Sequence, residues 1–146
     1  MTLPDLITKL ERTTEPDRWL DAKIDAAMRI GTVKMQTGGF EWAWDNFPVW
    51  AHHKQAPGMC GVQTTNGDLG LIWDSLPFTA SVDAAVALAD RMLPGKWPHI
   101  LRSALSDLGN RNDWHICLVR PDQMRALPPA IVLATLRALQ AKEDGR

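Results

Sequence analysis

The sequence predicts an α+β fold with a mostly antiparallel sheet, and three observations support this class. Apolar residues recur every three to four positions near both ends of the chain, which is the period of a helix that packs by one face. Between residues 32 and 76 the period changes to two, which is typical of strands. Trp114–Arg120 predicts a strand that is apolar on both faces, and such a strand belongs in the middle of a sheet covered on both sides.

Length and composition indicate one globular domain over residues 1–146. Hydrophobic residues make up 45% of the chain and charged residues 23%, close to the average for folded proteins. The 16 basic and 17 acidic residues nearly cancel. Because nucleic-acid-binding proteins usually carry a basic excess, the net charge of -1 argues against nucleic acid as a partner.

We expect a cytoplasmic protein without a membrane partner. The N-terminal segment MTLPDLITKL lacks a basic region followed by an apolar run, so no signal peptide is expected. No apolar stretch approaches the roughly 20 residues that span a bilayer. Two distant cysteines, Cys60 and Cys117, do not form a disulfide framework and indicate a reducing compartment.

Residues 1–31 predict two helices. The apolar face of the first helix consists of Leu3, Leu6, Ile7 and Leu10. Thr2 and Pro4 suit its start, because threonine caps helices and proline is tolerated in the first turn. Thr14 is expected to cap the second helix, with Pro16 in its first turn.

The second helix is expected to end at Gly31, because glycine readily adopts the left-handed conformation that stops a helix. Its predicted apolar face consists of Trp19, Leu20, Ile24, Ala27 and Met28. Asp21 and Asp25 lie one turn apart on the same helix, a charge pattern typical of a solvent-exposed face.

Residues 32–76 are expected to form an aromatic-rich segment of strands and loops. Alternation predicts one aromatic strand face that consists of Phe40, Trp42 and Trp44. Pro48 interrupts this strand, which favours an edge strand or a following turn.

The dipeptide Asn66-Gly67 predicts a two-residue hairpin, since it suits a type I′ turn. Folding the chain there produces the pairs Cys60 with Trp73, Val62 with Leu71 and Thr64 with Leu69. One face of the hairpin is then apolar, and we expect a half-buried antiparallel pair.

Residues 77–142 predict a helix, a strand and a second helix. Ser81 precedes the first of these helices, which Pro94-Gly95 ends. Its predicted apolar side consists of Val82, Ala85, Val86, Ala89, Met92 and Leu93. Trp97–Leu101 is a short apolar run that leaves strand and helix open. The last helix is expected over about Pro129–Lys142, before a charged tail that frays.

The segment Phe78–Ala85, FTASVDAA, follows an aromatic-Thr-x-Ser-apolar-Asp-Ala-Ala pattern, and its helix ends in Leu-Pro-Gly shortly before Trp97. Together with the helical opening and the last helix from Pro128, it resembles the phage ABA sandwich domain, a family of phages and prophages without an established activity. The resemblance implies that helices cover both faces of the sheet, which makes the fold an α/β/α sandwich. Residues 32–76 are longer than in this family, and Arg102–Leu108 has a helical rather than a strand pattern.

Motifs of known chemistry are missing: the sequence has no Gly-rich phosphate loop, no HExxH and no GxSxG. We therefore expect no cofactor and no metal ion. The alternative is a small hydrolase or transferase with a motif-less site near His52 and His53. Side chains that could complete such a site are Asp45, Cys60 and Asp68. His115 and Cys117 share one face of a predicted strand, where core packing is the favoured interpretation.

Aromatic residues gather around Pro48, in a chain with seven tryptophans and no tyrosine. Proline restricts its own backbone and that of Phe47, so Phe47 and Trp50 are expected on a stiff turn. Tryptophan is enriched among interface hot spots. We therefore expect these two rings to form the centre of a partner-binding surface with a polar rim of Asp45, Asn46, His52 and His53.

The expected function is that of a non-catalytic phage or prophage accessory protein that binds another protein in the host cytoplasm. Its partner would be a phage or host protein, in virion assembly or in the inhibition of a host target such as a defence complex. This expectation combines the family resemblance with the missing catalytic motifs. Binding of single-stranded nucleic acid is a less favoured alternative, because only Lys34 and Lys54 lie near the aromatic cluster.

Overall fold

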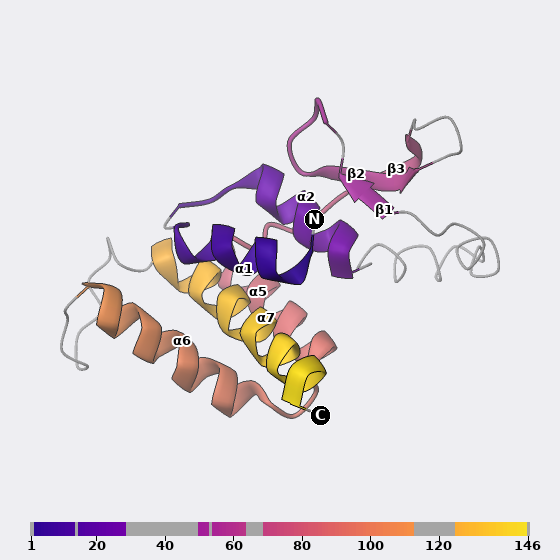
Figure 1. Cartoon of the computed structure of the whole chain (residues 1–146). Helices are drawn as coiled ribbons and strands as arrows, with labels where there is room; N and C mark the ends of the chain where they lie inside the picture. The colour runs from indigo at the N-terminus through magenta and orange to yellow at the C-terminus, as the bar shows by residue number, and fades with distance from the viewer. Residues whose placement is uncertain are drawn as a thin grey trace. The chain divides into compact units, whose positions relative to one another are not determined.

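The computed structural model describes residues 2–13, 15–28, 50–52, 54–63, 69–112 and 125–145 (Figure 1). The chain divides into two compact units. We call Arg18–Leu76 the mixed unit, because it contains a helix and strands. We call Thr2–Asp17 together with Pro77–Arg146 the helical unit.

The helical unit is built around its last helix. Its described residues form α1 (Leu3–Glu11), α5 (Val82–Met92), α6 (Trp97–Asn112) and α7 (Leu127–Gly145). α7 contacts each of the other three helices, which lie alongside it in Figure 1. All residues of the segment Pro128–Leu136 are buried. A helical segment that is buried on all sides must be covered on all sides, and α1, α5 and α6, which contact α7, provide this cover.

The start of α1 is fixed by a capping box between Thr2 and Asp5, and the helix agrees with the prediction. The backbone N–H of Asp5 donates to the Thr2 hydroxyl at 3.4 Å, and the backbone N–H of Thr2 donates to the Asp5 carboxylate at 3.1 Å. These bonds satisfy backbone donors that have no partner within the helix. Leu6, Ile7 and Leu10 are buried, as the periodicity predicts.

α5 also begins where the sequence predicts, since the Ser81 hydroxyl accepts a hydrogen bond from the backbone N–H of Ala84 at 3.2 Å. Gly95 follows the end of the helix with a φ of 77°, a conformation that suits glycine. The buried side is rotated relative to the predicted one and consists of Ala84, Ala85, Leu88 and Ala89. Val82, Val86 and Met92 of the predicted side are only half-buried.

The structure decides the ambiguous start of α6 and extends α7 beyond its predicted end. The ambiguous run Trp97–Leu101 is the start of α6, where the carbonyl of Lys96 accepts hydrogen bonds from the N–H groups of His99 and Ile100. α7 begins at Leu127 and continues to Gly145, so it includes the charged tail that was expected to fray.

The described residues of the mixed unit form α2 (Arg18–Met28) and a three-stranded antiparallel sheet of order β1-β2-β3. The strands are β1 (Trp50–His52), β2 (Met59–Gln63) and β3 (Leu69–Asp74). α2 packs on β1 and β2. The cross-strand pair Cys60 and Trp73 is confirmed, and both side chains are buried. A register shift follows Gly61, so that Gln63 rather than Thr64 lies opposite Leu69. The predicted turn Asn66-Gly67 itself lies outside the described residues.

The predicted α/β/α sandwich, a mostly antiparallel sheet with helices on both faces, is wrong. The described residues are mostly helical, and their sheet has three short strands. The physical reason lies in α7, whose apolar sides are covered by other helices rather than by a sheet. The predicted strands Phe40–Trp44 and Trp114–Arg120 lie outside the described residues.

The second helix also differs from its prediction. α2 begins at Arg18, so Pro16 precedes the helix instead of lying in its first turn. Trp19 was expected on the apolar face but is 38% exposed. Asp21 and Asp25 were expected in solvent but are 0% and 2% exposed. Both carboxylates have partners that justify their burial, as described below.

Candidate functional site

A groove runs between α6 and α7 in the helical unit. It consists of two adjoining cavities of about 500 and 300 Å³, which share the lining residues Ser103, Ala134 and Ala138. At one end of the groove the start of α6 lies beside the end of α7. At the other end a later part of α6 lies beside the first turns of α7. The two helices therefore run in opposite directions (Figure 1). We call this feature the α6–α7 groove.

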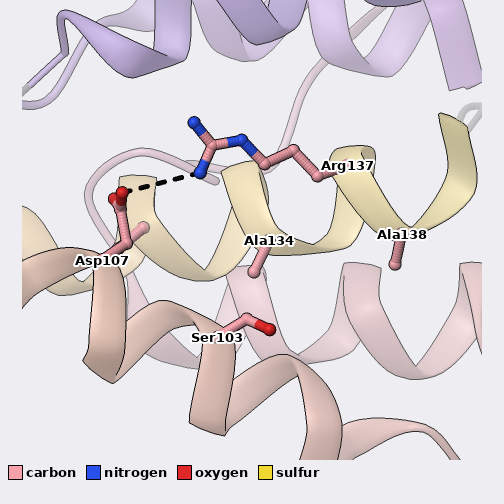
Figure 2. A pocket seen from close by; sticks show the side chains of 6 residues that line it. Ser103, Asp107, Ala134, Arg137 and Ala138 are labelled. Atoms are coloured by element: carbon pink, nitrogen blue, oxygen red, sulfur yellow. Dashed lines mark ion pairs between the residues drawn. The ribbon is translucent and has the colours of Figure 1, made fainter. Parts of the chain in front are cut away.

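The α7 side of the groove is lined by small apolar side chains. Alanines recur every three to four residues along one face of α7, at Ala130, Ala134, Ala138 and Ala141. Figure 2 shows Ser103 of α6 on the other side of the groove, facing Ala134. Leu93 and Ile100 add larger apolar groups at one end. Because the alanine side chain is one methyl group, another segment could approach the α7 backbone closely here.

One end of the groove is positively charged. Lys96, His99 and Lys142 line it, and all three are exposed. Within the described part of the chain, none of these three side chains makes a hydrogen bond or an ion pair. We call these residues the basic end. The two lysines carry positive charge that is available to a ligand, since neither forms an ion pair with a carboxylate of the described residues.

At the other end, Arg137 is held by carboxylates from two other helices. Its guanidinium donates to Glu11 of α1 at 3.0 Å and lies 3.5 Å from Asp107 of α6. Figure 2 shows the Arg137 side chain reaching from α7 toward Asp107. The charge of Arg137 is thus compensated within the helical unit, and this end of the groove is not basic.

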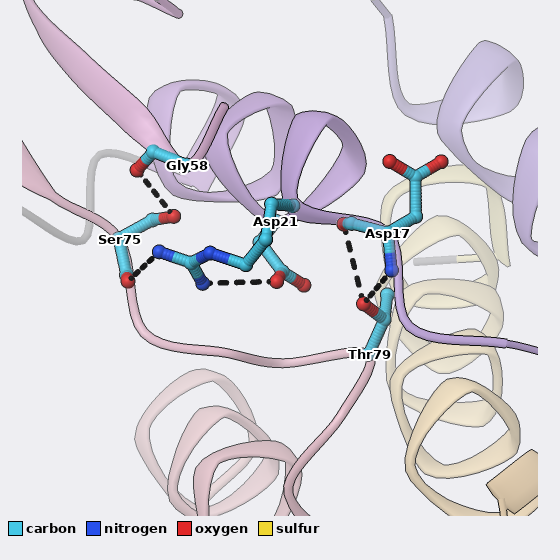
Figure 3. A network of polar contacts seen from close by, with 6 residues as sticks. Asp17, Asp21, Gly58, Ser75 and Thr79 are labelled. Atoms are coloured by element: carbon cyan, nitrogen blue, oxygen red, sulfur yellow. Dashed lines mark hydrogen bonds and ion pairs between the residues drawn. The ribbon is translucent and has the colours of Figure 1, made fainter. Parts of the chain in front are cut away.

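A second polar cluster lies in the mixed unit and has a structural role (Figure 3). The Arg18 guanidinium donates to the carbonyl of Ser75 at 2.8 Å and to the buried Asp21 carboxylate at 3.0 Å. Ser75 donates to the carbonyl of Gly58 from its hydroxyl at 2.8 Å and from its backbone N–H at 2.7 Å. These bonds join Ser75, which follows β3, to Gly58, which precedes β2, and to Arg18 of α2. The hydrogen bond from Arg18 thereby explains how the carboxylate of Asp21 can be buried.

In the helical unit, two hydrogen bonds join the two chain segments. The buried Thr79 hydroxyl accepts from the backbone N–H of Asp17 at 2.8 Å and donates to the carbonyl of Asp17 at 3.2 Å. This pair joins Thr2–Asp17 to the segment that begins at Pro77 (Figure 3).

Most of the predicted partner-binding surface lies outside the described residues, namely Asp45, Asn46, Phe47 and His53. Trp50 lies in β1, and His52 is half-buried in the same strand. The prediction of this surface therefore stays a prediction.

The alternative enzymatic site is described only in part. His52 lies directly opposite Cys60 in the pairing of β1 with β2, so the two side chains share one face of the sheet. On the other side of Cys60, its β3 partner Trp73 lies on the same face of the sheet. The indole N–H of Trp73 donates to the buried Asp25 carboxylate at 3.0 Å. Cys60 is 0% exposed. Asp45 and Asp68 lie outside the described residues, as does the predicted strand with His115 and Cys117.

The part of the chain that the structure describes contains no group of three His, Cys, Asp or Glu side chains placed to hold a metal ion. Among the same residues, no helix has the length and apolar character required to cross a membrane. Comparison of the chain with protein-family models, with curated proteins and with solved structures finds no significant match.

The groove residues were not identified from the sequence. The alanine repeat on α7 was a visible signal, but alanine is the strongest helix former and its repeat is usually explained by helix propensity alone. Lys96 and Lys142 are far apart in the sequence, and only the packing of α6 on α7 brings them to one end of a groove.

Proposed function

We propose that this chain is a protein-binding module and that the α6–α7 groove receives a helix of the partner protein. The observation that carries this proposal is the groove itself: a floor of alanines between two antiparallel helices, with exposed charged residues at its rim. Ala130 and Ala134 are already buried, so a third helix placed there would newly cover Ala138 and Ala141, and the charged rim would remain at the edge. Binding of an amphipathic helix in an apolar groove is a recurring mode of peptide recognition.

The openness of the groove favours a protein partner over a small molecule. Sites for small molecules usually enclose roughly 70–90% of the ligand surface. Here Lys96, Ser103 and Lys142, which line the groove, are exposed to solvent. A ligand in the groove would therefore stay open to solvent on one side, as a docked helix does. Small side chains on the floor suit this mode, because the distance between packed helices depends on the side chains at their contact.

The phage or prophage context is part of this proposal and rests on a separate observation, the FTASVDAA motif at Phe78–Ala85. In that context the module would act without catalysis, in virion assembly or by inhibiting a host target such as a defence complex. The fold that the resemblance implies is not the observed one, so the context depends on the motif alone.

A displayed library of helical peptides, selected on the folded full-length chain, tests the groove. Binding of the selected peptides is then compared between two matched variants, Ala141→Trp in the groove and Ala87→Trp on α5. Both alanines are exposed, and Ala87 does not line the groove. We expect Ala141→Trp to weaken binding by about tenfold or more, because the indole occupies the groove. Ala87→Trp should bind like the wild type, and both variants should keep the wild-type melting temperature. Equal affinities of the two variants would contradict the proposed site.

One observation favours the alternative of an enzyme: the register places His52 opposite Cys60, an arrangement in which a histidine could activate a thiol. A reactive cysteine requires thiolate character and access to the substrate. Alkylation of the native protein by iodoacetamide, read by mass spectrometry at Cys60, distinguishes the two functions. Because Cys60 is fully buried, we expect no reaction before unfolding. Rapid native alkylation that the variant His52→Ala slows would favour the enzyme.

A further inference from the structure

We propose that the partner helix carries carboxylates at the end that lies over Lys96, His99 and Lys142. This inference rests on the proposed function and adds the chemistry of the partner to it. Lys96, Lys142 and His99 stand at one end of the groove, are exposed, and make no side-chain hydrogen bond or ion pair with the described residues. They lie on both sides of the groove, because Lys96 directly precedes α6, His99 lies in its first turn, and Lys142 lies near the end of α7. A helix between them would place the two flanks of its apolar stripe next to positive charge.

The opposite end of the groove carries no uncompensated positive charge among the described residues. There, the single cation Arg137 is bound by two carboxylates, Glu11 and Asp107. The groove is therefore positive at one end and slightly negative at the other. A partner helix with acidic residues at one end only would complement both ends, and complementary potentials increase both the rate and the specificity of association.

The same charge pattern argues against the other anionic ligands. A single-stranded nucleic acid needs cations spaced along its phosphate backbone. In this groove the lysines without an ion pair lie at one end, and at the other end Arg137 is paired with the carboxylates of Glu11 and Asp107. A small anionic amphiphile such as a fatty acid needs an enclosed apolar cavity, whereas this groove is open along its exposed rim. An acidic helix fits the observations best.

The test uses two designed helical peptides of about five turns as probes, long enough to hold a helical shape. Both have the same stripe of alanine and leucine on one face. In the acidic peptide, glutamates flank the stripe at one end, and in the basic peptide lysines replace them. Fluorescence anisotropy measures their affinity for the full-length wild-type chain and for three variants: Lys96→Glu, Lys142→Glu and Lys9→Glu. Lys9 is exposed on α1 and does not line the groove, so its variant has the same net charge without changing the basic end.

We expect the wild type to bind the acidic peptide about tenfold or more tightly than the basic one. Lys96→Glu and Lys142→Glu should each weaken binding of the acidic peptide by about fivefold, whereas Lys9→Glu should have little effect. Equal affinity of both peptides, with loss of both in Ala141→Trp, would overturn the acidic partner and leave the groove proposal intact. Affinities unchanged by Ala141→Trp would overturn the groove as well. Displacement of the acidic peptide by oligothymidylate or by oleate at matched concentration would overturn the inference and assign the basic end to that ligand. Failure of both peptides to bind would also overturn the inference.

Discussion

Replacing Gly58 by alanine tests the polar cluster of the mixed unit, and its cost can be estimated from two terms. The first term is conformational: Gly58 has a φ of 80°, where a residue with a Cβ costs about 1–2 kcal/mol. The second term is a contact, because the new Cβ would lie 2.6 Å from Nε and 2.7 Å from Cζ of Arg18. The guanidinium can move away, but it then loses its bonds to Ser75 and Asp21. Because the Arg18 side chain is 35% exposed, water replaces part of this loss, and we estimate about 1–2 kcal/mol for it.

The total predicted loss in the free energy of unfolding is about 2–4 kcal/mol, measured by urea denaturation. A double-mutant cycle with Arg18→Ala separates the two terms. In the Arg18→Ala background, Gly58→Ala should cost only the conformational term, so the interaction energy should be about 1–2 kcal/mol. An equal cost in both backgrounds would refute the contact with Arg18. A total cost below about 0.5 kcal/mol would refute the conformational term too.

Three further predictions concern the helical unit, and each is checked by chemical denaturation of the full-length chain. Thr2→Ala removes the cap of α1 and should lower the free energy of unfolding by about 0.5–2 kcal/mol; no change would mean that the cap is not formed in solution. Hydrogen bonds from the Thr2 side chain, and then from its backbone, lower the pKa of Asp5, so the folded value lies below the unfolded one. The stability from this carboxylate is therefore present at neutral pH and is lost as the pH falls through the folded pKa. Asp5→Asn should destabilise the chain near about pH 7 but much less near about pH 2, and a difference independent of pH would contradict this assignment. Thr79→Val keeps the shape of a buried side chain but removes its bonds to Asp17, which should cost about 1–3 kcal/mol; a neutral result would show that other groups hold this segment.

The helices that the sequence predicts well are those whose signals are local. Thr2 and Ser81 each cap a helix that begins at the next residue, and their hydrogen-bond partners lie three residues away. The apolar residues of α1 repeat with the helical period, and the same residues are buried. Such signals lie within one or two turns of sequence, so they can be recognised without knowing the fold. The pair of Cys60 with Trp73 was predictable for a similar reason, because the two strands are close in sequence and alternate in polarity.

The errors concern residues whose environment comes from distant parts of the chain. Asp25 accepts a hydrogen bond from Trp73, which is 48 residues away, and Arg18 donates to Ser75, which is 57 residues away. The charge pattern of α2 alone predicts exposed carboxylates, because the partners that compensate their burial are not visible in the local sequence. The sandwich was predicted wrongly for the same reason. The apolar surface of α7 requires cover, but its pattern does not say whether a sheet or other helices provide it.

The two roles of α7, in the core and in the groove, overlap at Ala130 and Ala134 and are separate beyond Leu136. Pro128–Leu136 is buried and packs in the core of the helical unit. From Arg137 onward the residues are exposed or half-buried, and this part carries Ala138 and Ala141 of the groove. Truncating a core residue such as Leu133 to alanine would leave a cavity and cost about 2–5 kcal/mol, so any loss of binding there would be confounded by unfolding. Ala141 makes no such contribution to the core, because it is exposed. Loss of binding by Ala141→Trp at an unchanged melting temperature would therefore be due to the groove and not to the stability of the fold.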